Sequence, residues 1–292
     1  MPFGLHGTVV LFLSHEISDV TCSAYRHLRA TSGPGIEVCW LLDIASGIAP
    51  PAEFQAETQT YDSRGFADMG FATFGQKMLP GHCHFPVLDF YLRNPRITNL
   101  WVVEYDVRFT GRWSDFFGLM AGSDADLLAC HIRTPDQEPG WCWWGSLCEP
   151  VGSLPLEVRP LRAFLVIARF SARALDTVIA SHRSGWRGHQ EVIIPTLVSR
   201  AGLRIADIND VARDARGRAV YTSVNDPLGL LEELGTLRYR PIRSRPGIWP
   251  GMLYHPVKPT ASMNRAPFLP RLVRRCLIIL RAWGLRGYKG AH

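Results

Sequence analysis

The order of apolar and polar stretches in the first part of the chain predicts alternating strands and helices. Residues 8–13 (TVVLFL) and 36–43 (IEVCWLLD) are continuous apolar runs rich in β-branched side chains. Such runs are typical of strands buried on both faces of a parallel sheet. Between them, Asp19 is placed to cap a helix that ends near residue 29, and residues 31–35 (TSGPG) indicate a turn. Strand, helix and strand form one right-handed βαβ unit.

The same alternation continues to about residue 208. We expect further strands at 99–106, 126–132 and 203–208, and helices at 84–93, 113–121, 160–181 and 189–202. The helix at 160–181 is indicated by apolar residues at helical spacing, such as Leu161, Phe164 and Leu165. Residues 209–265 are rich in turns. The predicted fold class is therefore α/β, with a mostly parallel central sheet flanked by helices.

Composition is that of a folded protein. The 292 residues are 47% hydrophobic and 20% charged, which suits a single large α/β unit. The N-terminus has neither the basic region nor the cleavage site of a secretory signal, and the seven cysteines show no CxxC spacing. We therefore expect reduced thiols in a cytoplasmic protein. Zinc at His82-Cys83-His84 would need a second ligand pair at a recognised spacing, which the sequence does not offer.

Positive charge gathers at the C-terminus. The net charge is +6, but residues 265–292 hold seven basic residues and no acid, while the remainder has 25 basic and 26 acidic residues. A body without basic excess argues against nucleic acid as a partner. Residues 271–289 predict an amphipathic helix with arginines on one face, typical of helices that lie on an anionic membrane surface. The alternative is a helix packed on the body with its arginines exposed. We expect one folded domain over 1–264 and a membrane-associating tail over 265–292, peripheral on the inner face of the membrane.

The most informative segment is 100–117, in which an apolar strand ends in Glu104 and Asp106. Ligands of open parallel sheets sit at the carboxyl ends of strands, where Asp43 also falls. Because strand residues i and i+2 share a side, the two carboxylates are expected to converge, with Tyr105 pointing the other way. Oxygen ligands of this kind suit Mg²⁺ or Mn²⁺, which bind carboxylates together with substrate phosphates.

Arg108 and Arg112 follow these carboxylates at once. Guanidinium groups there would contact substrate phosphates or hold the carboxylates in place. The alternative for the whole segment is a salt-bridged strand end without a ligand.

Residues Trp101 to Gly111 match the segment W-x-x-E-x-D-x-R-(F/Y)-T-G of a glycosyltransferase-like family. Over roughly residues 8–260, the layout resembles the GT-A glycosyltransferases, which have a Rossmann-like fold and a D-x-D or related motif. Here the motif is Glu104-Tyr105-Asp106, with Glu in the first place. The resemblance implies transfer of a sugar from a nucleotide-sugar donor, UDP-linked in many members, to a hydroxyl of a glycan or lipid-linked acceptor in cell-surface polysaccharide synthesis.

The resemblance also implies roles for single residues. Glu104, Asp106 and His255 would hold Mn²⁺ or Mg²⁺, Lys258 would contact the diphosphate, and the donor would also meet Ser14, Asp43 and Arg108. Glu191 would act as the general base of an inverting enzyme, with His189 as a weaker candidate. The alternative for Glu191 is an acid that the macrodipole favours in the first turn of a helix. The tryptophans at 141, 143 and 144 suit either a sugar ring or the core.

Two other functional classes fit parts of this pattern. A non-catalytic carbohydrate-binding or scaffold protein would keep the transferase fold while its catalytic residues degenerate. A metal-dependent phosphoesterase would need more carboxylate and histidine ligands than the sequence places.

Overall fold

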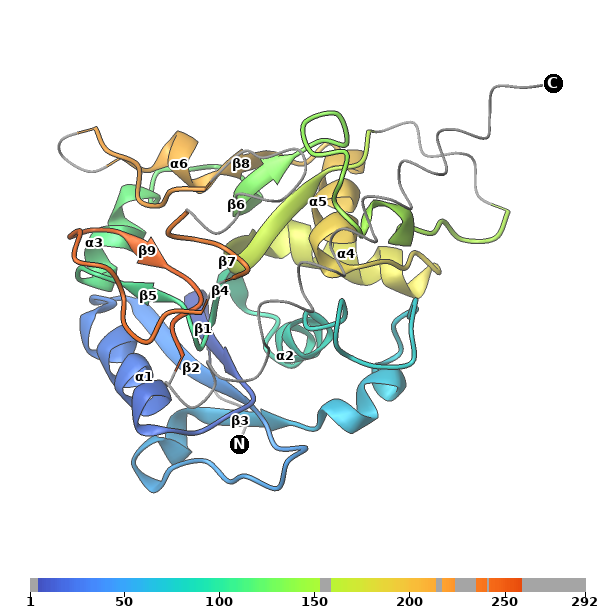
Figure 1. Ribbon diagram of the computed structural model, residues 1–292. Helices are drawn as coiled ribbons and strands as arrows, with labels where there is room; N and C mark the ends of the chain where they lie inside the picture. Colours follow the sequence, from blue (N-terminus) through green and yellow to red (C-terminus); the bar gives the residue numbers. More distant parts are fainter. Residues whose placement is uncertain (1–4, 153–158, 214–216, 224–234, 241, 259–292) are drawn as a thin grey trace, which may run out of the picture.

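A seven-stranded sheet forms the centre of the protein, with the strand order β3-β2-β1-β4-β7-β6-β8 (Figure 1). The computed structural model describes residues 5–152, 159–213, 217–223, 235–240 and 242–258. The strands of the large sheet are β1 (Gly7–Ser14), β2 (Ile36–Asp43), β3 (Thr58–Tyr61), β4 (Ile97–Glu104), β6 (Leu127–Arg133), β7 (Arg162–Ser171) and β8 (Ile205–Asp207). A small second sheet pairs β5 (Arg108–Phe109) with β9 (Leu253–Tyr254).

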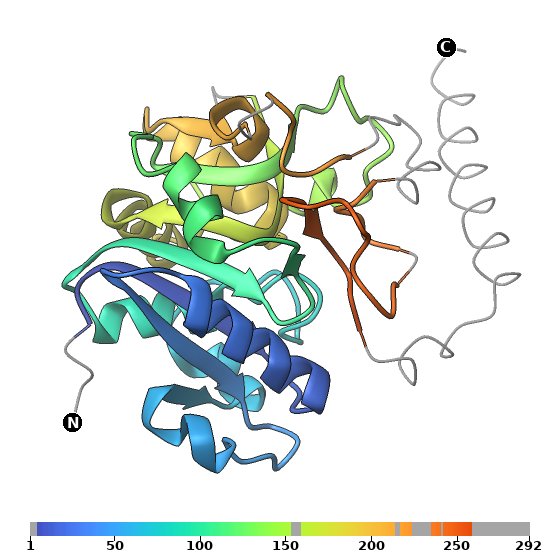
Figure 2. The same ribbon diagram turned by 90° about the vertical axis from the view of Figure 1, so that its left-hand side faces the viewer.

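Helices cover both faces of the large sheet (Figure 2). The α-helices are α1 (Asp19–Thr31), α2 (Phe85–Arg93), α3 (Trp113–Leu119), α4 (Ala172–Arg183), α5 (Gln190–Arg200) and α6 (Ile208–Val211). Short 3₁₀ helices lie at Ala52–Glu57, Ser63–Met69 and Trp144–Ser146. Apolar side chains of α1 and α3 pack in one core cluster, and those of α2, α4 and α5 pack in another. The predicted α/β class is confirmed.

The predicted helix at 160–181 is wrong over its first half. Residues 162–171 are strand β7, which lies between β4 and β6 and runs antiparallel to both. Nine of its ten residues are buried. A strand buried on both faces lacks alternation, so its apolar spacing cannot be told from that of a buried helix. The helix α4 begins only at Ala172, where the Ser171 hydroxyl accepts a hydrogen bond from the Ala174 amide.

The direction of the strands determines which residues gather at one edge of the sheet. β1 pairs in parallel with β2 and β4, and Leu13 lies opposite Glu104. The carboxyl ends of these three strands therefore face the same edge. β7 starts at this edge because it runs the opposite way, and Arg162 lies opposite Arg133 at the end of β6.

The remaining predicted elements agree with the structure to within two residues at each end. No helix among the described residues is long and apolar enough to cross a membrane. The predicted tail, 265–292, lies outside the described residues.

Candidate active site

Two carboxylates and a histidine meet where β4 ends. Glu104 is the last residue of β4, Asp106 follows in a turn, and His255 comes directly after β9. The Nε2 atom of His255 lies 3.4 Å from Asp106 Oδ1 and 3.8 Å from Glu104 Oε2. One potential ligand atom from each side chain lies within 4.8 Å of the other two. In the part of the chain that the structure describes, no other three His, Cys, Asp or Glu side chains are gathered this closely.

The chemistry of these three side chains fits a divalent cation. His255 Nδ1 lies 2.8 Å from the carbonyl oxygen of Arg238, which only accepts, so Nδ1 is the donor. In the neutral ring, Nε2 then turns its lone pair towards the carboxylates, the orientation of a metal-ligating histidine. Among the described residues, none makes a hydrogen bond to the buried Oδ1 atom of Asp106, which is costly unless a cation or donor meets this atom. Two carboxylates and an imidazole are ligands that Mn²⁺ and Mg²⁺ accept.

Burial and mutual charge shift the protonation of this cluster. Burial raises the pKa of Glu104 to about 7, and the nearby charge of Asp106 adds to the rise. Burial acts in the same direction on Asp106, but the charges of His255 and Lys258, together with the Lys258 contact, outweigh it and hold the pKa of Asp106 well below its usual range. For His255, burial opposes protonation, but Asp106 and Glu104 outweigh it and raise its pKa. The two carboxylates therefore favour positive charge at this position.

Lys258 adds a positive charge next to the cluster. Its Nζ lies 3.1 Å from Asp106 Oδ2 and donates a hydrogen bond to Tyr105 Oη at 2.7 Å. The Val257 amide donates to the Asp106 carbonyl at 2.8 Å, which ties the segment after β9 to the turn after β4. The prediction that Tyr105 points away from the site is wrong, because residues 105 and 106 form a turn in which strand alternation no longer applies.

A cavity of about 670 Å³ opens over the cluster. This volume suits a ligand of the size of a small cofactor or nucleotide. Its wall includes the cluster itself, Glu104, Asp106, His255 and Lys258. Other lining residues lie near the ends of β1, β2 and β3, in the loop before α2, at the start of α5 and in the segment before β9. They include His15, Asp43, Tyr61, Ser63, Arg64, residues 76–81, His189 to Glu191, Tyr239 and Arg240. The predicted metal ligands, Lys258, Asp43 and Glu191 therefore face one common space.

Of the predicted donor-binding residues near the N-terminus, Asp43 lines this cavity and Ser14 does not. One carboxylate oxygen of Asp43 accepts a hydrogen bond from the Ser63 amide at 3.0 Å, which fixes the start of the 3₁₀ helix at 63–69. The Ser14 hydroxyl donates to the Glu16 carbonyl at 2.8 Å and accepts from the Trp40 indole N–H at 3.2 Å. The Ser14 side chain thus stabilises the end of β1 through these two hydrogen bonds and lies outside the cavity lining.

Arg108 also lies outside the cavity lining. Its guanidinium group donates to the carbonyl oxygens of Tyr105 and Val107 at 2.6 Å and 2.8 Å. Burial lowers the pKa of Arg108 to about 10. The side chain therefore stabilises the turn that carries Asp106, while Arg112 is exposed at the start of α3.

The predicted base, Glu191, lies in the first turn of α5. The helix is capped by His189, whose Nδ1 accepts a hydrogen bond from the Glu191 amide at 3.3 Å. The Glu191 carboxylate lines the cavity and lies 3.8 Å from Arg162 Nη2. Its position satisfies both alternatives, a base that faces a substrate and an acid that the helix dipole favours.

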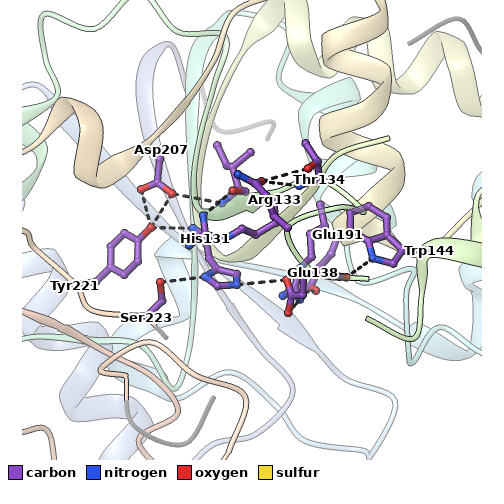
Figure 3. Close-up of polar contacts among 12 residues, drawn as sticks. His131, Arg133, Thr134, Glu138, Trp144, Glu191, Asp207, Tyr221 and Ser223 are labelled. Atoms are coloured by element: carbon purple, nitrogen blue, oxygen red, sulfur yellow. Dashed lines mark hydrogen bonds and ion pairs between the residues drawn. The ribbon is translucent and has the colours of Figure 1, made fainter. Parts of the chain in front are cut away.

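A buried polar network of Arg162, Glu138 and His131 lies next to Glu191 (Figure 3). Arg162 donates to Glu138 Oε1 at 2.8 Å, and Glu138 Oε2 lies 3.5 Å from His131 Nε2. All three side chains are buried. His131 has a φ of 52°, and its amide donates to the Tyr221 hydroxyl at 2.8 Å. A positive φ at a residue other than glycine is strained, and such residues concentrate at functional sites. Sequence reasoning missed this network.

The tryptophans at 141–144 support the network and His189. The rings of Trp143 and His189 stack at 4.8 Å with an interplanar angle of 14°. The Arg162 guanidinium lies 4.6 Å from the Trp141 ring centroid, and the Trp144 indole N–H donates to the Glu138 carbonyl at 2.8 Å. Of the two alternatives for these aromatic residues, the contacts favour packing over a sugar-binding surface.

Comparisons with known proteins give matches by structure alone. Neither the models of protein families nor the curated proteins match the sequence. A galactosyltransferase, LgtC, in complex with donor and acceptor sugar analogues matches with 10% identity and a TM-score of 0.38, over 68% of this chain and 73% of that one. An active-site mutant of LgtC matches with 12% identity and a TM-score of 0.41, over 92% and 95%.

The bifunctional glycosyltransferase WbbM, in its apo form, matches with 7% identity and a TM-score of 0.41. That match covers 70% of this chain but only 39% of WbbM.

Proposed function

We propose that this protein is a metal-dependent glycosyltransferase. It would move a sugar from a nucleotide-sugar donor to a hydroxyl of a glycan or lipid-linked acceptor at the inner face of a membrane. The observation that carries the proposal is the grouping of Glu104, Asp106, His255 and Lys258 on the wall of one nucleotide-sized cavity at the carboxyl edge of the sheet. Catalytic residues at such an edge, built on different elements, are the usual arrangement in open α/β folds.

Each group has a role in this reaction. Glu104, Asp106 and His255 would hold Mn²⁺ or Mg²⁺, which supplies positive charge beside the departing nucleotide diphosphate. Lys258 would add its own charge to the diphosphate and stabilise the leaving group. The part of the cavity lined by Asp43, Tyr61 and Arg64 would receive the base and ribose. Glu191 would accept the proton of the acceptor hydroxyl as its oxygen attacks the anomeric carbon, which gives inversion.

The test compares sugar transfer by wild-type protein and the Glu191→Gln variant. A thermal-shift screen with Mn²⁺ first selects the nucleotide-sugar, and transfer to sugar acceptors is then measured. Removing a general base lowers the rate by roughly 10²–10⁴-fold, whereas donor affinity should stay within about twofold, because Gln keeps the shape of the side chain. Glu53→Gln, at an exposed ion pair with Arg26, is the matched control with unchanged rate.

Equal transfer rates for Glu191→Gln and the wild type would remove Glu191 from the mechanism. Binding of a glycan without metal or nucleotide, in the absence of any transfer, would instead favour the non-catalytic carbohydrate-binding alternative.

The membrane association of the tail and the identity of the donor are also proposals. The basic sequence 271–289 supports membrane association of residues 265–292, with residues 1–264 as the catalytic domain. A UDP-linked donor and a role in cell-surface polysaccharide synthesis rest on the family resemblance.

A further inference from the structure

The loop at residues 244–251 exposes two large apolar side chains side by side in the sequence. Ile248 is 93% exposed and Trp249 is 62% exposed. Pro246, Gly247, Pro250 and Gly251 surround them. Single exposed apolar residues are common on protein surfaces, but an adjacent isoleucine and tryptophan on one loop suggest an interaction site.

The backbone of this loop is held in place by hydrogen bonds. Thr110, after β5, exchanges hydrogen bonds with Met252 at 3.0 Å in both directions, accepts from the Gly251 amide at 3.1 Å, and donates its hydroxyl to the Trp249 carbonyl. Gly247 passes so close to the Tyr254 ring that a Cβ there would lie 2.5 Å from it. The exposure of Ile248 and Trp249 is therefore built into the fold and does not come from an unattached segment.

The charge of the sequence that contains the loop indicates the chemistry of its partner. From residue 235 to the C-terminus the sequence contains no acid and 12 of the 32 basic residues, whereas the first 234 residues contain 20 basic and all 26 acidic ones. Arg245 is exposed in the loop, and Arg240 is half-buried just before it. Such a segment attracts an anionic surface. Tryptophan side chains favour the headgroup region of a lipid bilayer, where the ring meets both apolar and polar surroundings. Basic side chains nearby are attracted to anionic headgroups.

We propose that loop 244–251 docks on an anionic lipid surface. Ile248 and Trp249 enter the headgroup region, and Arg245 lies at the level of the phosphates. Gly247 of the loop lies against Tyr254, and the next residue, His255, lines the cavity, so docking brings the wall of the cavity near the lipid headgroups. A lipid-linked acceptor would be presented there. This last consequence rests on the proposed transferase function, whereas the docking itself does not.

The first test is co-sedimentation of the full-length protein with vesicles. Wild-type protein is expected to bind vesicles of phosphatidylcholine with phosphatidylglycerol and to bind pure phosphatidylcholine vesicles less. In Ile248→Ser/Trp249→Ser, loss of the apolar contact should weaken binding by about tenfold or more. Val151→Ser, at a residue that is 99% exposed on another loop, is the matched control and should bind like the wild type. Equal binding of the double variant and the wild type overturns the proposal.

The second test asks whether Trp249 itself enters the bilayer. Brominated lipids quench only tryptophans that reach the bilayer, so part of the quenching should be lost in Trp249→Phe. Unchanged quenching in that variant overturns the proposal. A third outcome also overturns the proposal: the wild type self-associates, the double variant does not, and vesicle binding is the same in both. The loop would then join two copies of the chain. Sugar transfer to a water-soluble acceptor should be unchanged in the double variant, which separates this proposal from the transferase function.

Discussion

At the scale of single residues, the site depends on buried charges that compensate one another. Asp106 is 2% exposed and meets both His255 and Lys258. Burying a charge is costly, and removing one partner leaves the other uncompensated. Changes at Asp106 or Lys258 are therefore expected to disturb the whole cluster, and neutral variants of similar shape are more informative than alanine.

A second buried pair, Glu138 and Arg162, stands behind the predicted base. Arg162 lies 3.8 Å from Glu191, and a nearby positive charge favours the ionised carboxylate. In the double variant Glu138→Gln/Arg162→Met, the pair is removed together, which avoids an unpaired buried charge. Loss of the nearby positive charge should move the acid limb of its pH–rate profile to higher pH, while the KM for the donor stays within about twofold.

The measurement is kcat/KM across pH 5–9 for the double variant and the wild type. Arg162→Lys, which keeps the charge, serves as the conservative comparison and should return the acid limb towards its wild-type position. An acid limb that stays in place in the double variant would show that Arg162 has only a structural role.

At the scale of elements, the ends of β1, β2 and β4 were predictable from the sequence. Continuous apolar runs that end in Asp43 and Glu104 locate the edge of the sheet where the cavity lies. His255 and Lys258 carried no such local signal, because a turn-rich segment around β9 brings them to Asp106 across about 150 residues. The family resemblance alone suggested these two residues, and the structure places both beside Asp106.

The antiparallel strand β7 marks the limit of prediction from apolar spacing. Its residues are buried on both faces, so no alternation separates a strand from a helix there. This error also hid the role of Arg162. At the exposed end of a helix, its side chain would lie in solvent, whereas at the first position of β7 it is buried beside Glu138. Side chains that meet through such long-range pairing leave no spacing pattern in a single sequence.

At the scale of the whole molecule, buried neutral histidines link separate elements. His182 of α4 and His84, just before α2, share a hydrogen bond of 2.8 Å between their Nε2 atoms. His182 Nδ1 donates to the Trp186 carbonyl at 3.0 Å, so His182 Nε2 accepts from His84. Burial lowers the pKa of His182 to about 4, and the pKa of His84 also falls well below its usual range. Both rings are therefore neutral in the folded protein at neutral pH.

These shifts predict that acid weakens the fold. Because the folded-state pKa of His182 lies below the unfolded value of about 6.5, the unfolded chain binds more protons between these two values. Stability is then fully present above pH 6.5 and falls as the pH drops towards 4. The shift of His182 corresponds to at most about 3 kcal/mol of unfolding free energy.

Urea unfolding at pH 7.5, 6.0 and 5.0 measures this effect. The loss between pH 7.5 and 5.0 should be smaller in His182→Gln, which removes the titrating group, than in the wild type. Equal losses in the two proteins would contradict the contribution of the His84–His182 contact.

The proposed function requires that Glu104, Asp106 and His255 hold a divalent cation and, with Lys258, a nucleotide diphosphate. Isothermal titration with UDP, GDP and CMP, each with and without Mn²⁺, tests this requirement. One nucleotide should bind the wild type only with Mn²⁺. Asp106→Asn changes a ligand itself and should weaken that binding by more than the roughly 10–100-fold that is typical for changes to the partners of a ligand. Asp124→Asn, at an exposed aspartate paired with Arg204, should bind like the wild type. Nucleotide binding that is independent of Mn²⁺, or unchanged in Asp106→Asn, would rule out a metal-dependent nucleotide site at these residues.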